Sequence, residues 1–331
     1  MRITNSMMSK NFLRDVNKNQ NSLRTINNQL TSGKEFRKPS DDPFKVARSM
    51  QLHGDIGANI QYNQNIKDTI SLLDTTDAAL DQVNNVFQRV RELMVSAGNA
   101  AYGVDEKRAI KNEINQKIGE VSQILNTNFD GKYIFGGTKG SSKPVGSMED
   151  VATGNNIIHL SGKDGEILEL NSSEEDIKNQ IDMIGSGLST EISQGVKIEY
   201  SVTATDILMF KNLEGNSINL MDLFKDITNN LDSSNLADSK KITNENLKDM
   251  DYVISNILKT RAEVGSKQNR MESAQEQNEA ENFNIKGILS KIEDIDFAEK
   301  TIEASVMQSV YTAALQTSGK ILQPTLMDFL R

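Results

Sequence analysis

Apolar residues recur every three or four positions at both ends of this 331-residue chain, whereas the middle shows a different pattern. This spacing places the residues on one face of a helix, and such a face needs a partner. We expect the two ends to pair with each other. The stripe near the amino terminus includes Phe12, Val16, Leu23, Ile26 and Leu30. The stripe near the carboxyl terminus includes Ile302, Val306 and Val310, flanked by Ile295, Ala298 and Ala313.

Between the two ends, the pattern predicts long helices separated by turns. The segment Ser40-Asp41-Asp42-Pro43 is typical of a helix start, with Ser40 as the expected cap and Pro43 in the first turn. An apolar stripe then continues from Ile66 to Met94, and a shorter helix from Ile110 to Leu125 is expected to fold back.

The segment from Leu247 to Ile292 has the most regular pattern, because its seam positions alternate three and four residues apart without a slip. A repeat of about 3.5 residues predicts a left-handed coiled coil. The seam becomes polar at Gln275, Asn278 and Asn282. Since a polar seam packs less well, we expect a flexible joint there, opposite the connector at 32–43.

Glycine marks the middle of the chain, where 11 of the 21 glycines lie between Gly136 and Gly215. Segments 157–160 and 167–170, with Asp164-Gly165 between them, predict a β-hairpin, and 196–202 alternates like a strand. We therefore expect a mainly α fold: an antiparallel coiled-coil helical rod formed by the N- and C-terminal segments, with a small β-rich domain inserted at the far end. The expected domains are a terminal helical assembly domain (1–31 plus 285–331), a helical rod domain (32–135 plus 217–284) and an outer insert domain (136–216).

Composition favours elongated helices over one large globular core, because hydrophobic content is 37%, aromatic content is 5% and tryptophan is absent. A net charge of −9 argues against binding to nucleic acid, which needs a basic face. The absence of cysteine removes disulfides and thiol chemistry. No segment has the length of apolar sequence that a membrane span needs, so we expect no membrane partner. The first residues lack the apolar run of a cleaved secretory signal.

The sequence offers no constellation of catalytic residues. The two histidines, His53 and His159, have no partner at catalytic or metal-ligand spacing, and each is expected to be a packing or surface residue. The glycine-rich segment 136–140 lacks the spacing and ending of a phosphate-binding loop. We expect a non-enzymatic protein without a cofactor or metal.

Two segments carry a resemblance to a known family. Residues 126–138, Asn-Thr-Asn-Phe-Asp-Gly-Lys-Tyr-Ile-Phe-Gly-Gly-Thr, and the closing residues 317–331 resemble the flagellin superfamily and, within it, the hook-associated protein 3 branch. Flagellins usually carry a Leu-Leu pair where this chain has Tyr133-Ile134-Phe135. The turn at 40–43 and the segments 88–93 and 261–270 are similar to the wider superfamily. The resemblance covers about 1–138 and 245–331, and leaves the insert without a match.

The resemblance implies that the terminal helices are disordered in the free monomer and pair on assembly. Isolated helices are marginal in water, and ordering then accompanies binding. It also implies an export chaperone on 302–330 and export without a cleaved signal. The expected assembly interface adds Arg89, Leu93, Leu326, Phe329 and Leu330 to the two terminal stripes. An ordinary antiparallel coiled coil in a stable monomer is the alternative interpretation of those stripes.

The function implied by the resemblance is that of a structural subunit secreted through the flagellar export apparatus. Such a subunit joins the hook, through hook-associated protein 1, to the flagellin filament, with copies of itself in a ring at the hook–filament junction. Two alternatives stay open at this point. The chain could be a flagellin that forms the filament itself, or an intracellular coiled-coil interaction protein.

Overall fold

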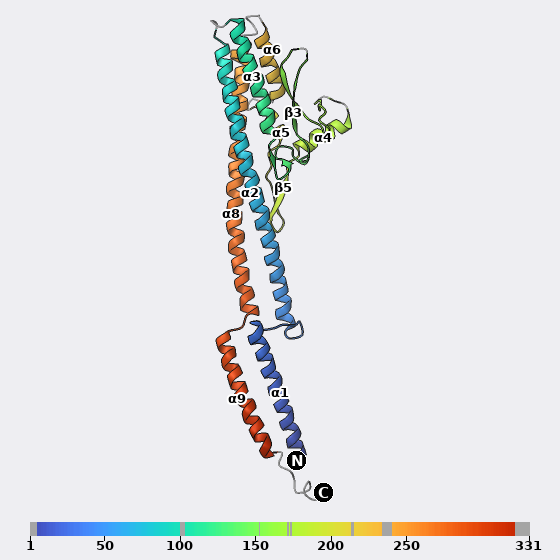
Figure 1. Ribbon diagram of the computed structural model, residues 1–331, viewed down its shortest axis with the longest axis vertical. Coiled ribbons are helices and arrows are strands. Elements are labelled where there is room, and N and C mark those ends of the chain that lie inside the picture. Colours follow the sequence, from blue (N-terminus) through green and yellow to red (C-terminus); the bar gives the residue numbers. More distant parts are fainter. Residues whose placement is uncertain are drawn as a thin grey trace. The chain divides into compact units, whose positions relative to one another are not determined.

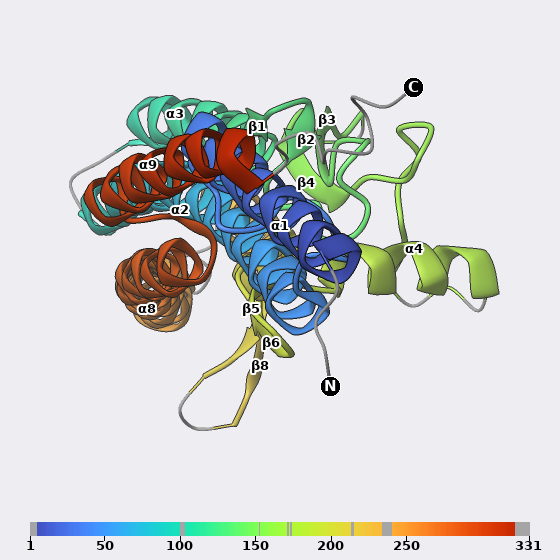
Figure 2. The ribbon, with the colours of Figure 1, turned by 90° about the horizontal axis from the view of Figure 1, so that it is seen from below.

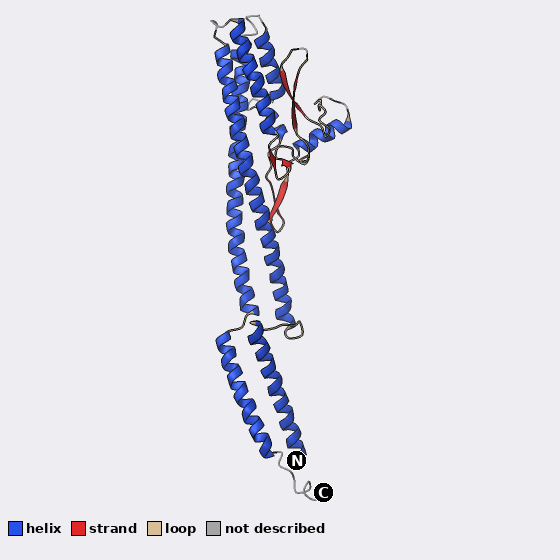
Figure 3. Ribbon diagram, viewed as in Figure 1, coloured by secondary structure: helices blue, strands red, loops and turns tan. Residues whose placement is uncertain are grey.

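The computed structural model describes residues 5–99, 103–151, 153–170, 172, 174–212, 215–233 and 240–321. These residues form long helices and small antiparallel pairs of strands (Figures 1 and 3), so the expected fold class, mainly α with a β-rich insert, is confirmed. The chain divides into two compact units, one of residues 1–60 with 280–331 and one of residues 61–279. The three-part domain division expected from sequence stays a prediction.

The first unit contains a pair of terminal helices, α1 (Asn5–Ser32) and α9 (Phe297–Ile321), which pack side by side (Figures 1 and 2). Helix α1 ends at Gly33, whose φ of 71° lies in the left-handed region that favours glycine. Its N–H donates to the carbonyl of Gln29 at 2.8 Å. A connector of residues 33–42 then leads to α2 (Pro43–Ala97).

The start of α2 is where the sequence places it, but the expected capping residue is wrong. The carboxylate of Asp42 accepts hydrogen bonds from the backbone N–H groups of Phe44 and Lys45, at 3.1 and 3.0 Å. Asp41 accepts from Arg37 and Lys38 and thereby shapes the connector. Ser40 lies too early to cap, because the residue directly before Pro43 takes that position.

The second unit is built around the C-terminal part of α2 and the N-terminal part of α8 (Leu247–Glu293), which run antiparallel. Arg261 of α8 forms ion pairs with Asp77 and Asp81 of α2, at 3.0 and 2.6 Å, and Arg91 pairs with Asp251. Helices α3 (Val104–Leu125) and α6 (Leu220–Asp232) complete this helical core, and a π-helical turn, η1 (Ile242–Asn246), leads into α8. The rings of Phe87 and Phe224 meet at its centre, 6.2 Å apart.

Between α3 and α6, the described residues form four two-stranded antiparallel ribbons and two short helices. The ribbons are β1 (Asn128–Phe129) with β2 (Lys132–Tyr133), β3 (Val145–Glu149) with β4 (Asn156–Leu160), β5 (Ser189–Ser193) with β6 (Val196–Glu199), and β7 (Met209–Lys211) with β8 (Ser217–Asn219). The helices are α4 (Glu175–Gly185) and α5 (Ala204–Leu208).

The hairpin expected between 157–160 and 167–170 is correct only in part. Segment 157–160 pairs with β3 as strand β4. The turn at Asp164-Gly165 does form, because an antiparallel bridge joins Ser161 to Ile167, the N–H of Leu168 donates to the carbonyl of Leu160 at 2.9 Å, and Gly165 has a positive φ. A second Asp-Gly turn lies at Asp130-Gly131, between β1 and β2, where both residues have positive φ. Strand β6 does fall within the expected 196–202 segment.

The polar part of the α8 seam does not break the helix, since α8 continues without interruption to Glu293. Asn278 and Asn282 are buried there, and the boundary between the two units falls next to them, at 279/280. The flexible joint itself stays a prediction, but its expected place opposite the connector is wrong. The backbone N–H of Glu35 donates to the carbonyl of Glu293 at 2.6 Å, and the N–H of Ile295 donates to Gly33 at 3.2 Å.

Candidate assembly interface

The apolar stripe of α1 is the part-buried face of that helix. Phe12, Val16, Leu23 and Leu30 are half-buried, and Ile26 is only 4% exposed. Since α1 packs against α9, the stripe supplies the apolar side of this helix pair. The expectation that the two ends of the chain pair is therefore correct for α1.

Helix α9 packs against α1 through a face that the sequence pattern does not indicate. Its part-buried positions recur at alternating spacings of four and three, and they are Lys300, Ala304, Met307, Tyr311, Ala314 and Ser318. The expected pairing through Ile302, Val306 and Val310 is wrong, because these side chains are 66%, 57% and 45% exposed. Ala304 and Ala314 are small, so they let α1 approach closely. The stripe of Ile302, Val306 and Val310 is centred about a third of a turn away around the helix.

Because α9 meets α1 through a different face, the described residues leave Ile302, Val306 and Val310 uncovered. Their place in an assembly interface stays a prediction, and their exposure is the property that such an interface requires. Leu326, Phe329 and Leu330, the other expected contact residues at this end, lie outside the described residues.

The two terminal helices are tied to the rest of the first unit by a polar cluster around Glu293. The ammonium of Lys34 donates to Glu293 at 2.8 Å and to Asp294 at 2.7 Å. The other oxygen of Glu293 accepts from the Ser49 hydroxyl and lies 2.9 Å from Nε2 of His53. No local pattern in the sequence predicts this cluster, because 240 residues separate His53 from Glu293.

Hydrogen bonds set the charge states of this cluster. The pKa of Lys34 is raised by its hydrogen bonds to Asp294 and Glu293, which favour the ammonium. Burial acts to raise the pKa of Glu293, but hydrogen bonds from Lys34, Ser49 and His53 outweigh it, so the pKa lies below its ordinary value. The pKa of Asp294 is lowered chiefly by the hydrogen bond from Lys34. The cluster therefore holds a charged carboxylate at neutral pH.

The two expected contact residues on α2 lie in different surroundings. Arg89 is exposed and pairs with Glu92 at 3.0 Å and Glu113 at 2.8 Å, and these bonds raise its pKa. Leu93 is only 6% exposed and belongs to the hydrophobic core of the second unit. A contact with a neighbouring subunit at this stretch stays a prediction, and Arg89 is the residue whose side chain is placed to make it.

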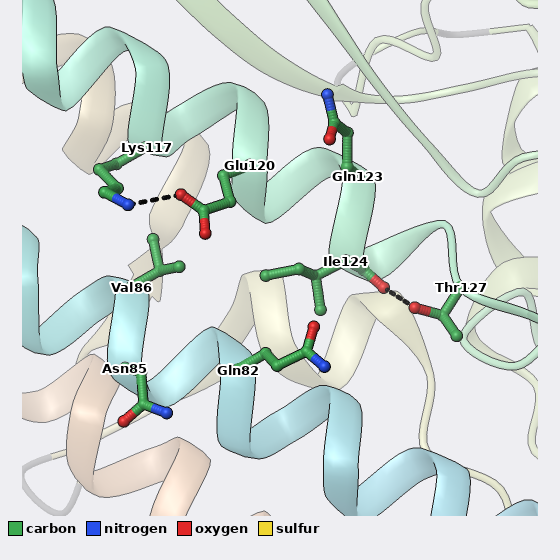
Figure 4. A pocket seen from close by; sticks show the side chains of 8 residues that line it. All are labelled: Gln82, Asn85, Val86, Lys117, Glu120, Gln123, Ile124 and Thr127. Atoms are coloured by element: carbon green, nitrogen blue, oxygen red, sulfur yellow. Dashed lines mark hydrogen bonds and ion pairs between the residues drawn. The ribbon is translucent and has the colours of Figure 1, made fainter.

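Polar side chains line a groove among the described residues of the second unit. A groove of about 580 Å³ between α2 and α3 is lined mainly by polar side chains, among them Gln82, Lys117 and Glu120 (Figure 4). Lys117 and Glu120 pair with each other there, 2.6 Å apart. Within the described ranges, His, Asp and Glu form no group of three that could hold a metal. None of the described helices is long and apolar enough to cross a membrane.

Two family models match most of this chain. The model of the bacterial flagellin N-terminal helical region matches residues 3–140, and that of the C-terminal helical region matches residues 247–330. The chain therefore belongs to the flagellin family. As a member of that family it is a structural subunit of the bacterial flagellum, exported and assembled with other flagellar components.

Two relatives that are similar to this chain in sequence are flagellins. The flagellin of Bacillus subtilis is 28% identical over 98% of this chain and 99% of its own length. The flagellin of Clostridium tyrobutyricum is 32% identical, but the match spans only 42% of this chain and 37% of that protein.

Among solved structures, a flagellar hook-associated protein of Vibrio parahaemolyticus has a TM-score of 0.59 at 16% identity, covering 77% of this chain and all of that one. The flagellar hook-associated protein-3 of Legionella pneumophila has a TM-score of 0.56 at 13% identity, covering 75% of this chain and 98% of that one. At such identities the likeness concerns the fold.

Proposed function

We propose that this chain is a junction subunit that joins the flagellar hook, through hook-associated protein 1, to the flagellin filament. The observation that carries the proposal is the fold, since hook-associated structures align over 98–100% of their own length. The Tyr133-Ile134-Phe135 segment adds support from the sequence. In this role a small number of copies forms a ring or layer at the hook–filament junction.

The proposed assembly depends on α9. Its exposed stripe of Ile302, Val306 and Val310 buries apolar surface only when a neighbouring subunit covers it. Before assembly, a flagellar export chaperone covers the C-terminal segment 302–330. The subunit has a structural role and no enzymatic activity in this proposal.

A flagellin that builds the filament itself is the second candidate. The end-to-end match with the Bacillus subtilis flagellin favours it, because 98% of this chain aligns with 99% of that protein. Both candidates use the same terminal helices, and they differ in whether a layer of subunits accepts further copies of itself.

Seeded polymerisation followed by electron microscopy separates the two candidates. Purified protein is added to hooks that carry hook-associated protein 1, with a flagellin as the matched control. The junction role predicts one short layer that then accepts flagellin but adds no further copies of this chain. Long filaments of this chain alone would make it a flagellin, and failure to bind hooks at all would reject the junction role.

A further inference from the structure

The hairpin formed by β5 and β6 docks onto both long helices of the second unit. The side-chain amide of Asn65, on α2, donates to the carbonyl of Glu191 at 3.1 Å. The side-chain amide of Asn278, on α8, donates to the carbonyl of the next residue, Ile192, at 2.9 Å. Figure 1 shows β5 beside the middle of α2. One short segment of the insert is therefore held by two helices that are far apart in the sequence.

The strand pairing is irregular at the residues that make this double contact. The register of β5 against β6 shifts between Glu191 and Ser193, at Ile192. In a regular strand successive carbonyls point to opposite sides, whereas a bulge breaks the alternation and redirects the backbone. The side chains of Ile192 and of Ile198 on β6 are both buried in the core cluster of the second unit. Apolar packing and hydrogen bonds thus fix the hairpin to the helices together.

The hairpin also accounts for Asn278, one of the polar residues in the seam of α8. Asn278 is only 4% exposed, and a buried amide without a partner is strongly destabilising. Its partner is the hairpin carbonyl, not another side chain of the seam. On α2, the side-chain Oδ1 of Asn65 accepts a hydrogen bond from the side-chain amide of Gln61 at 3.0 Å, which orients the Nδ2 of Asn65 toward Glu191.

We propose that the β5–β6 hairpin is a strap that holds α2 and α8 together over the polar part of their seam. In this proposal the insert determines how tightly α2 and α8 pack against each other in the second unit. This inference concerns the chain whether it builds a junction or a filament, so it does not depend on the proposed function.

Native-state hydrogen exchange on the full-length chain, read by mass spectrometry, tests the strap. Asn278→Ala removes one hydrogen bond, and a net bond of about 1 kcal/mol corresponds to an exchange rate about fivefold faster. We expect this increase both in the hairpin, residues 189–199, and in the facing part of α8, residues 272–279. Asn65→Ala removes the hydrogen bond from α2, so exchange in the same hairpin should also become faster.

Gln275→Ala is the matched control, because Gln275 is a polar seam residue that donates to Glu279 of its own helix at 3.0 Å. It should leave exchange in the hairpin unchanged. Asn278→Leu is a second test that keeps the seam filled and makes it apolar, and the strap predicts a looser hairpin in this variant too. Unchanged hairpin exchange in the Asn278 variants, a loosened hairpin with α8 unaffected, or an equal effect of Gln275→Ala would each overturn the proposal.

Discussion

Glu293 is the side chain through which the first unit joins three segments of the chain. It accepts hydrogen bonds from Lys34 of the connector and from Ser49 and His53 of α2, while its own backbone carbonyl accepts from Glu35. A buried carboxylate needs such partners, since its desolvation would otherwise outweigh its interactions. The charged form is therefore part of the folded structure.

Glu293→Gln should lower the free energy of unfolding by about 2 kcal/mol at neutral pH, because it removes charge-assisted hydrogen bonds. The pKa of Glu293 is lower in the folded state than its ordinary value of 4.5, so its contribution is present above that value. As the pH falls through the lowered pKa, the contribution is lost and the two proteins should become equally stable. Urea denaturation at a series of pH values measures this difference.

Glu281→Gln is the control for that series, because Glu281 is an exposed residue of the same helix. It should change the unfolding free energy little at any pH. A Glu293→Gln variant as stable as the unaltered protein at pH 7 would contradict the role given to this carboxylate.

Arg89→Ala should leave the fold intact and weaken subunit assembly. Arg89 is exposed and its two ion pairs lie at the surface, where such pairs contribute little to stability. A loss of seeded polymerisation with an unchanged thermal unfolding curve is the expected result. Lys259→Ala, which removes an exposed ion pair with Glu263 on α8, is the control. Normal assembly of the Arg89 variant would remove this residue from the interface.

At the scale of elements, α9 carries apolar residues on two faces with different roles. One face, centred on Ala304, Met307 and Ala314, lies against α1, and the other carries Ile302, Val306 and Val310 into solvent. An exposed helix face of this kind is typical of a contact between proteins. We therefore expect the first face to stabilise the folded chain and the second to contact neighbouring subunits.

Replacing Ile302, Val306 and Val310 together by serine should abolish assembly while leaving helix content and thermal unfolding nearly unchanged. Serine and valine have similar helix propensities, and the replaced side chains are exposed in the subunit. Circular dichroism and seeded polymerisation provide the two readouts. Met307→Ala, on the face toward α1, serves as the contrasting variant and should lower stability. Normal assembly of the triple serine variant would show that the stripe is not an interface.

At the scale of the whole molecule, we expect the terminal segments and the insert to have separate roles. The two family models match residues 3–140 and 247–330 and leave residues 141–246 unmatched, although the Bacillus subtilis flagellin aligns with 98% of this chain. Assembly residues are expected in the part that the models match, whereas the proposed strap formed by β5 and β6 belongs to the part that they leave unmatched.

Deleting residues 322–331 should prevent assembly and leave unfolding of the remaining chain unchanged. The deleted segment contains Leu326, Phe329 and Leu330, apolar residues that the resemblance assigns to assembly. Electron microscopy of seeded hooks and a urea titration of the monomer measure the two effects. Entry of the truncated protein into hook–filament junctions would contradict the assembly role of this segment.

The sequence by itself determined the long helices, because helical periodicity and turn residues act locally, whereas it did not predict the short helices α4 and α5. Local patterns predicted the stripe of α1, the start of α2 at Pro43 and the regular seam of α8. Only the tertiary structure decided which face of α9 meets α1, which carboxylate caps α2, and that Asn278 serves a hairpin. These choices depend on side chains distant in sequence, such as His53 with Glu293, whose contact no local pattern encodes.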